Sequence, residues 1–351
     1  MAGSGRVAVL GAGAMGTALA VHMARAGVET VLLATDRDGA IVDAWREGAP
    51  HPALQVPFAH VPCLAPDQWP GALPGARIVL VAVSSGGLAP VLARAARDAA
   101  PATWVLATKG WEPGTLRRPS EVVAATLGPV PVAAITGPAI AAEIAVGAPT
   151  GLLVASRIQT ARREVAALLE GPSTAVFTTT DVIGAETAAA FKNVVAVAVG
   201  LAEGLAARFT ESAVPRSFAN ARAAVFARGV LDMAALVQAQ GGRVATVLGL
   251  AGSGDLYVTC GHGRNGRFGR LLGEGASVEA ALRSIGSTVE GIANTAAALE
   301  LAARAGLDLP SARIVDQALR AELTDDLAPD RLRALFATAV ATDAAARVVS
   351  P

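Results

Sequence analysis

The stretch 249–269, which reads GLAGSGDLYVTCGHGRNGRFG, concentrates residue types that bind small anions. Five glycines precede the adjacent Arg264 and Asn265, and Asp255 and Thr259 lie among these glycines. Glycine lets backbone approach a ligand closely, the planar guanidinium of arginine matches phosphate or carboxylate, and asparagine adds donors and an acceptor. We therefore expect this stretch to form the floor of a site for a small anionic substrate.

Lysine is rare in this chain, which has only Lys109 and Lys192 among 29 basic side chains. A desolvated lysine can lose its proton near neutral pH and act as a base, whereas arginine stays protonated. Lys192 lies in an apolar helical stretch, AAAFKNVVAVAVG, and is the better candidate for a catalytic base; a surface lysine is the alternative. Lys109 ends a strand in ATKG, at the sheet edge where open α/β sheets bind ligands. An ordinary loop position is its alternative.

A second glycine-rich loop lies near the N-terminus, in VAVLGAGAMGTALA. Gly11, Gly13 and Gly16 follow a strand pattern and open a helix, the arrangement in which a tight turn and a helix N-terminus hold the pyrophosphate of a dinucleotide. The loop, with Ala14 and Met15 at the start of the helix, predicts a site for NAD or NADP.

The next strand ends in LLATDRD, and Asp36 follows Gly16 at nearly the spacing of an acid that binds the ribose 2′-hydroxyl of NAD. Arg37 beside it would instead suit the 2′-phosphate of NADP. A solvated turn is the alternative for both residues, so the sequence leaves the choice between NAD and NADP open.

The surrounding pattern predicts two domains, a dinucleotide-binding domain at 1–181 and a helical substrate and catalytic domain at 182–351. Short apolar runs alternate with helical stretches in the first, which indicates a Rossmann-type, doubly wound and mostly parallel α/β sheet. The expected strands are 6–10, 28–34, 77–83, 103–108, 131–135, 151–155 and 175–178, and the helices 16–26, 88–99, 118–127 and 159–169. The second domain is expected to be all-α, with helices at 182–207, 219–240, 277–285, 289–306 and 311–323, and an irregular loop at 205–219.

Composition narrows the class of protein. A net charge of +0 argues against nucleic-acid partners, and although 53% of residues are hydrophobic, no uninterrupted apolar run reaches the roughly 18 residues of a membrane span. Two cysteines and no leader pattern favour a cytoplasmic protein. The four histidines lack metal-ligand spacing, so we expect no metal. The alanine-rich helical domain could support a homodimer.

Seven motifs occur in the order found in NAD(P)-dependent glycerol-3-phosphate dehydrogenases, and the chain resembles that family from about Val7 to Leu319. They are GAGAMGTALA, ATKGWE, GPAIAAEIA, FKNVVAVAVGLAEG, GLAGSGDLYVTC, GRN and VEG. The resemblance implies hydride transfer between NAD(P) and a small phosphorylated substrate, interconverting sn-glycerol 3-phosphate and dihydroxyacetone phosphate.

The resemblance also implies roles for particular residues. Lys192 would accept the C2 hydroxyl proton, Lys109 would stabilise the alkoxide, and Asp255 would bind the lysine and the substrate hydroxyls. Further substrate contacts are implied for Gly137, Thr259, Arg264 and Asn265, the last two at the phosphate. Cofactor contacts are implied for Lys109, Ala141, Arg264 and Glu290; for Glu290, a first-turn acid stabilised by the helix dipole is the alternative.

Several positions depart from the family pattern. Ala139 and Gly263 stand where hydroxyl residues are usual, VSSGG replaces a valine-proline-serine at the cofactor edge, and LAARFTESAVPRSFAN (205–220) replaces a compact turn. Two alternatives therefore stay open: the same chemistry on another phosphorylated or phosphonate alcohol, or a non-catalytic NAD(P)-binding sensor.

Overall fold

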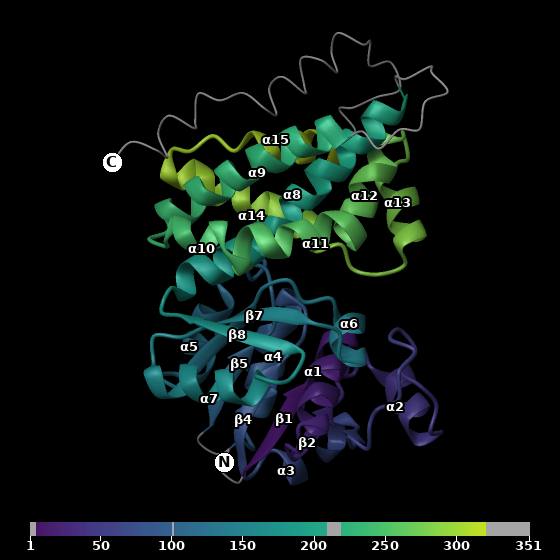
Figure 1. The fold of residues 1–351 in the computed structure, drawn as a ribbon, viewed down its shortest axis with the longest axis vertical. Helices are drawn as coiled ribbons and strands as arrows, with labels where there is room; N and C mark the ends of the chain where they lie inside the picture. The colour runs from purple at the N-terminus through teal and green to yellow at the C-terminus, as the bar shows by residue number, and fades with distance from the viewer. Residues whose placement is uncertain (1–4, 100–101, 209–218, 321–351) are drawn as a thin grey trace. The chain divides into compact units, whose positions relative to one another are not determined.

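A computed structural model describes residues 5–99, 102–208 and 219–320 of the chain (Figure 1). The chain divides after Val182 into two compact units. The first unit contains an eight-stranded sheet in the order β3-β2-β1-β4-β5-β6-β7-β8, parallel except at the antiparallel β6–β7 pair. Its first six strands have the Rossmann order, which confirms the predicted fold class. The strands are β1 (Arg6–Leu10), β2 (Thr30–Leu33), β3 (Cys63–Leu64), β4 (Ala76–Val81), β5 (Thr103–Leu106), β6 (Val132–Thr136), β7 (Thr150–Ala155) and β8 (Thr174–Thr179).

Helices connect the strands of this unit, as the alternating pattern predicts (Figure 1). They are α1 (Ala14–Arg25), α2 (Gly39–Arg46), α3 (Trp69–Ala72) after a short 3-10 turn (Pro66–Gln68), α4 (Ser85–Ala95), α5 (Pro119–Leu127), α6 (Ala141–Val146) and α7 (Gln159–Leu169). Parallel strands covered on both faces read as unbroken apolar runs, and β1 and β4 carry fully buried side chains such as Val7, Val9, Ile78 and Leu80.

Several details of the sheet differ from expectation. The second strand begins at Thr30 rather than at residue 28. Strands β4 and β5 end at Val81 and Leu106 rather than at residues 83 and 108. Strand β3 could not be predicted from the sequence, because its two residues, Cys63–Leu64, are too few to show an alternating pattern. It is defined by its pairing with Leu32 and Leu33 of β2.

The second unit is helical in the part that the structure describes, as predicted. Its helices are α8 (Val182–Arg208), α9 (Ala219–Ala239), α10 (Val244–Leu248), a π-helical turn η2 (Leu250–Gly254), α11 (Asp255–His262), α12 (Arg264–Gly273), α13 (Val278–Ile285), α14 (Glu290–Ala305) and α15 (Pro310–Leu319). Helix α8 is long and apolar enough to cross a membrane by length and composition. However, 89% of its most apolar window is buried in the unit, as in the core helix of a globular domain.

Helices α8 and α12 pack in backbone contact, and glycines make this possible. A Cβ on Gly200 would lie 2.0 Å from the Gly266 carbonyl oxygen, and one on Gly269 would lie 2.0 Å from that of Val197. Any side chain at these positions would push the helices apart. Gly266 and Gly269, which follow Arg264 in the stretch 249–269, therefore lie at a helix–helix contact and not at a ligand.

The irregular loop expected at 205–219 is also partly wrong. Residues 205–208 continue helix α8, and Ala219 begins α9. The rest of that segment lies outside the described residues, as does the tail from residue 321, including the end of the helix expected at 311–323.

Candidate functional site

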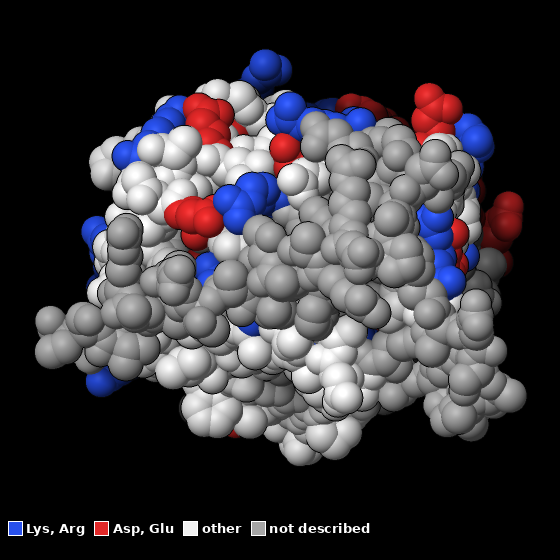
Figure 2. All heavy atoms as spheres, turned by 90° about the horizontal axis from the view of Figure 1, so that it is seen from above, with Lys and Arg blue, Asp and Glu red and all other residues white. Residues whose placement is uncertain are grey.

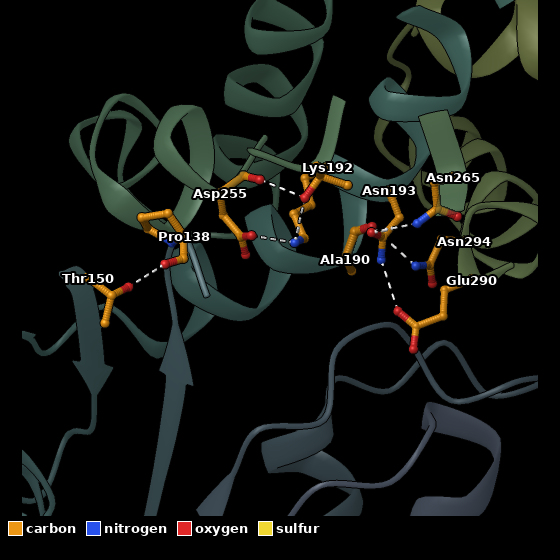
Figure 3. A network of polar contacts seen from close by, with 10 residues as sticks. Pro138, Thr150, Ala190, Lys192, Asn193, Asp255, Asn265, Glu290 and Asn294 are labelled. Atoms are coloured by element: carbon orange, nitrogen blue, oxygen red, sulfur yellow. Dashed lines mark hydrogen bonds and ion pairs between the residues drawn. The ribbon is translucent and has the colours of Figure 1, made fainter. Parts of the chain in front are cut away.

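Lys192 lies at the centre of a buried polar cluster in the helical unit (Figure 3). Its Nζ donates hydrogen bonds to Asp255 Oδ1 and, over 2.9 Å, to Thr259 Oγ1. The side chains of Lys192 and Asp255 are only 7% and 2% exposed. Desolvation offsets much of the attraction between two ions that are buried this deeply. We therefore interpret the pair as positioning the lysine nitrogen rather than as stabilising the fold.

A π-helical turn places Asp255 against the lysine. In η2 the amide of Gly254 donates to the carbonyl of Gly249 over 3.2 Å, a bond five residues long. A Cβ on Gly252 would lie 2.1 Å from the Val247 carbonyl oxygen, so the turn requires glycine there. Such turns interrupt regular helices at functional sites, and this one ends at Asp255, the first residue of α11.

Thr259 lies one helical turn after Asp255, and its hydroxyl is oriented by the backbone. The hydroxyl donates to the Asp255 carbonyl oxygen over 2.6 Å, which turns its lone pairs to the Lys192 ammonium. Asp255 and Thr259 thus fix the position of the lysine nitrogen from two sides.

Asn193, the next residue on α8, joins three helices (Figure 3). Its side-chain oxygen accepts from Asn265 Nδ2 over 3.0 Å, and its Nδ2 donates to Glu290 Oε2 over 3.0 Å. Asn265 Oδ1 in turn accepts from the Gly291 amide over 2.9 Å. The sequence did not single out Asn193; its place beside Lys192 was the available signal. The network fixes Asn265 and Glu290, both candidate ligand contacts, relative to the lysine.

The adjacent Arg264 and Asn265 have different environments. Asn265 is 8% exposed and held by the network. Arg264 is exposed at the first position of α12 and has no hydrogen-bond or ion-pair partner in the described part of the chain. Gly263 before it makes the turn between α11 and α12, where a Cβ would lie 2.3 Å from the Thr259 carbonyl oxygen. A side chain at position 263 would therefore collide with the backbone of α11, so the tight turn requires glycine.

In the sheet unit, the loop after β1 has the shape of a dinucleotide cradle. Gly11 adopts φ +99°, and a Cβ on Gly16 would lie 2.0 Å from the Gly11 carbonyl oxygen, so both positions require glycine. A Cβ on Gly13 would meet nothing within 4 Å, which leaves space for a ligand above the start of α1, where Ala14 and Met15 lie. The residues present therefore fit the pyrophosphate of NAD or NADP.

Two residues that the sequence did not reveal hold this loop. Asp38 Oδ2 accepts from the Ala12 amide over 3.2 Å, and the Ala12 carbonyl oxygen lies 3.1 Å from Nε2 of the buried His51. The other ring nitrogen of His51 accepts from the amides of Ala53 and Leu54. Nε2 must then carry the hydrogen and donate to Ala12, so the imidazole is neutral, and its burial lowers the pKa below the ordinary value.

Asp36 and Arg37 are both exposed at the turn after β2. Asp36 also lies 3.7 Å from Arg94 of α4, whose guanidinium stacks 4.6 Å over the Trp69 ring. An acid and two arginines thus border the position expected for the ribose, and the choice between NAD and NADP stays a prediction.

A small cavity of about 10 Å³ in the sheet unit has Lys109 in its lining, together with Met15, Thr136 and Ala139. The Thr136 hydroxyl is buried and has no hydrogen-bond partner among the described residues, which makes it a further candidate to bind a ligand group. Gly137 follows at φ +111°, and Ala141 begins α6. The cavity thus brings together Lys109, Met15 and Ala139, the position of the missing hydroxyl.

The two cysteines, both free, are not suited to nucleophilic chemistry. Burial raises the pKa of the Cys63 thiol to about 11 and that of Cys260 to about 12, so both stay protonated at neutral pH. Within the described ranges, no group of three or more His, Cys, Asp or Glu side chains could hold a metal ion.

Comparison with known proteins gives a consistent result for both units. Residues 6–162 match the family model of the NAD-dependent glycerol-3-phosphate dehydrogenase N-terminus, and residues 181–328 match that of its C-terminus. The glycerol-3-phosphate dehydrogenase [NAD(P)+] of Stenotrophomonas maltophilia is 38% identical over 340 residues, covering 95% of this chain and 94% of that protein. Its Xanthomonas oryzae counterpart is 38% identical and covers 92% of each. The crystal structure of glycerol-3-phosphate dehydrogenase from Coxiella burnetii superposes with a TM-score of 0.84 at 33% identity, covering 95% of this chain and 99% of that one.

Proposed function

The chain belongs to the NAD-dependent glycerol-3-phosphate dehydrogenase family, and from this premise we propose that it interconverts sn-glycerol 3-phosphate and dihydroxyacetone phosphate by hydride transfer. NAD or NADP is the cofactor. Within this proposal, the buried cluster of Lys192, Asp255 and Thr259 is the observation that carries the chemistry, because oxidation of a secondary alcohol needs a positioned group that takes the hydroxyl proton.

In the oxidative direction, Lys192 in its neutral amine form accepts the proton from the C2 hydroxyl and becomes the ammonium as that carbon loses hydride. In the reductive direction, the Lys192 ammonium returns the proton to the same oxygen. The Asp255 carboxylate balances the charge of the ammonium, and Thr259 holds the nitrogen in line over 2.9 Å. A general base placed in this way accelerates such a step by about 10²–10⁴-fold. Lys109 supplies a second positive charge for the developing alkoxide.

The nicotinamide cofactor supplies the hydride acceptor or donor when bound. The loop of Gly11, Gly13 and Gly16 holds its pyrophosphate at the start of α1, with Ala14 and Met15 beside it. Asp36 and Arg37 contact the ribose end. Lys109, Ala141, Arg264 and Glu290 contact the remainder of the cofactor.

The phosphate end of the substrate binds Arg264 and Asn265. The exposed Arg264 guanidinium provides a planar pair of donors for phosphate oxygens, while Asn265 contributes a donor that Asn193 has already oriented. Gly137 lets the substrate approach the backbone, since its conformation excludes a side chain.

A direct assay tests the activity. Purified protein mixed with dihydroxyacetone phosphate and NADH, or NADPH, should oxidise the cofactor, and glycerol 3-phosphate with NAD or NADP should reverse the reaction. Absence of turnover with both cofactors in both directions would contradict the proposal.

We also propose a cytoplasmic location and a homodimer. The two free thiols are consistent with a reducing compartment, and the helical unit is rich in alanine, which permits close packing between copies. Light scattering of the purified protein measures the oligomeric state.

A further inference from the structure

A cavity of about 360 Å³ lies within the helical unit, and most of the charged residues in its lining are arginines. Arg264, Arg267 and Arg270 come from α12 and Arg222 from α9, whereas Glu203 of α8 is the one acid among the lining residues that the structure describes. Elsewhere on this unit, basic and acidic side chains pair, as Arg313 does with Asp308 over 2.7 Å. Figure 2 shows the two kinds interspersed on the face that it presents.

The cavity is separate from the Lys192 cluster. Lys192, Asp255, Thr259 and Asn265 are all absent from its lining. Arg267 and Arg270 follow Gly263 by four and seven positions, so they share one face of α12. Asn265 lies on another face of the helix, toward Asn193 and Gly291. Only Arg264 borders the cavity and is also a candidate contact for the substrate.

The charges within the cavity do not balance. Glu203 lies 3.6 Å from Arg222 and 3.7 Å from Arg270, so one carboxylate serves two guanidinium groups. Arg270 has a second acid in Glu274, over 2.7 Å. Arg267 has a neutral partner, the Ser284 hydroxyl at 3.2 Å. The other lining residues that the structure describes add no charge, because burial keeps the Cys260 thiol protonated.

We propose that this cavity binds a small polyanion carrying phosphate groups, as a ligand distinct from the proposed substrate. Guanidinium groups that converge from two helices form bidentate, charge-assisted hydrogen bonds with phosphate oxygens. A ligand with two or more negative charges neutralises the excess that Glu203 leaves. The volume admits a molecule the size of pyrophosphate or a small bisphosphate, while the absence of the Lys192 cluster from the lining means that such a ligand is not placed for hydride transfer.

Calorimetric titration with pyrophosphate tests the proposal. The titration is done with saturating NADH and glycerol 3-phosphate, which are both reduced and cannot react, so that the proposed cofactor and substrate phosphate sites are filled. We expect saturable binding that weakens at least about tenfold in the double variant Arg222→Gln/Arg267→Gln, because the phosphate oxygens lose two charge-assisted partners. Arg304→Gln, on α14 outside the cavity, is the matched control and should bind as the unaltered protein does.

Three outcomes would overturn the proposal: no saturable binding, equal binding by the double variant, or displacement of pyrophosphate by glycerol 3-phosphate. The last would mean that the cavity is part of the substrate site. If the double variant fails to fold by circular dichroism, Arg267→Glu alone, at an exposed position, replaces it with the same expected loss. Repeating the titration without NADH and glycerol 3-phosphate keeps this test independent of the proposed activity.

Discussion

The side-chain oxygen of Asn193 accepts a hydrogen bond from Asn265 over 3.0 Å, and this bond joins the helix that carries Lys192 to the helix that carries Arg264. The residue proposed to move the proton and those proposed to bind phosphate are thus linked through two neighbouring amides. The covalent chain of a substrate limits the distance between its reacting carbon and its phosphate, so this link helps to determine whether both ends fit at once.

Asn193→Ala should therefore raise KM for the phosphorylated substrate about tenfold, because Asn265 and Glu290 lose their partner and Asn265 is no longer oriented. Steady-state kinetics with dihydroxyacetone phosphate measure the change. Asn294→Ala is the matched control: Asn294 is 2% exposed and donates to the Ala190 carbonyl over 3.1 Å, and among the described residues it makes no hydrogen bond to a proposed ligand residue. It should lower stability by a similar amount and leave KM unchanged. An equal rise of KM in both variants would mean that Asn193 has only a structural role.

Lys192→Met should lower kcat about a thousandfold while leaving NADH affinity nearly intact, since it removes the proposed base. The single variant also leaves Asp255 buried without its partner, at a cost of about 3–5 kcal/mol in stability. The double variant Lys192→Met/Asp255→Asn removes both charges and should be equally inactive but more stable. Single-turnover kinetics and urea unfolding measure the two effects. A single variant that keeps a tenth of the activity would show that Lys192 is not the base.

The sequence predicted the first-unit fold well because its signals are local. Each of the longer strands appears in the sequence as an apolar run next to a glycine or a helical stretch, and the Gly11–Gly16 loop directly follows the first of these runs. The place of β3 in the sheet and the packing of the stretch 249–269 depend instead on residues that are distant in the sequence. Strand β3 exists through its pairing with β2, and Gly266 and Gly269 are glycine because α8 packs against them.

The same distinction applies to the candidate site. Lys192, Asp255 and Thr259 were each identified from the sequence, and the structure brings them into direct contact. Asn193, His51 and Asp38 were missed because each acts through a hydrogen bond to a residue far along the chain. Local sequence reveals residue types suited to chemistry, whereas the groups that orient them depend on tertiary contacts.

Asp36→Ala should shift the cofactor preference toward NADP, raising the ratio of kcat/KM for NADPH over NADH about tenfold. Its carboxylate, 84% exposed, would repel a 2′-phosphate, and its removal leaves Arg37 and Arg94 at that position. Kinetics with each cofactor give the ratio. Asp43→Ala removes another exposed acid of this unit, paired with Arg46 over 3.5 Å, and should leave the ratio unchanged. An unchanged ratio in Asp36→Ala would place the ribose away from this turn.

His51 should make the protein less stable at mildly acidic pH. Burial lowers the pKa of His51 in the folded state, so the unfolded chain binds the proton more readily. Its contribution to the free energy of unfolding is complete above the ordinary pKa of about 6.5 and is lost as the pH falls toward the lowered folded value. Thermal melting between about pH 5 and pH 8 should show a steeper acid loss in the unaltered protein than in His51→Gln.

Placing a hydroxyl residue at position 263, by Gly263→Ser, should impair this protein rather than improve it. The new Cβ would lie 2.3 Å from the Thr259 carbonyl oxygen and would force α11 away from α12. Because Thr259 holds the Lys192 nitrogen, the shift should lower kcat as well as stability, the latter by about 1–3 kcal/mol as in other overpacked sites. Gly261→Ser is the matched control, since a Cβ there meets nothing within 4 Å. Kinetics and urea unfolding of the two variants separate the effects. Higher activity in Gly263→Ser would mean that the turn yields and that the missing hydroxyl, not the close approach to Thr259, limits catalysis.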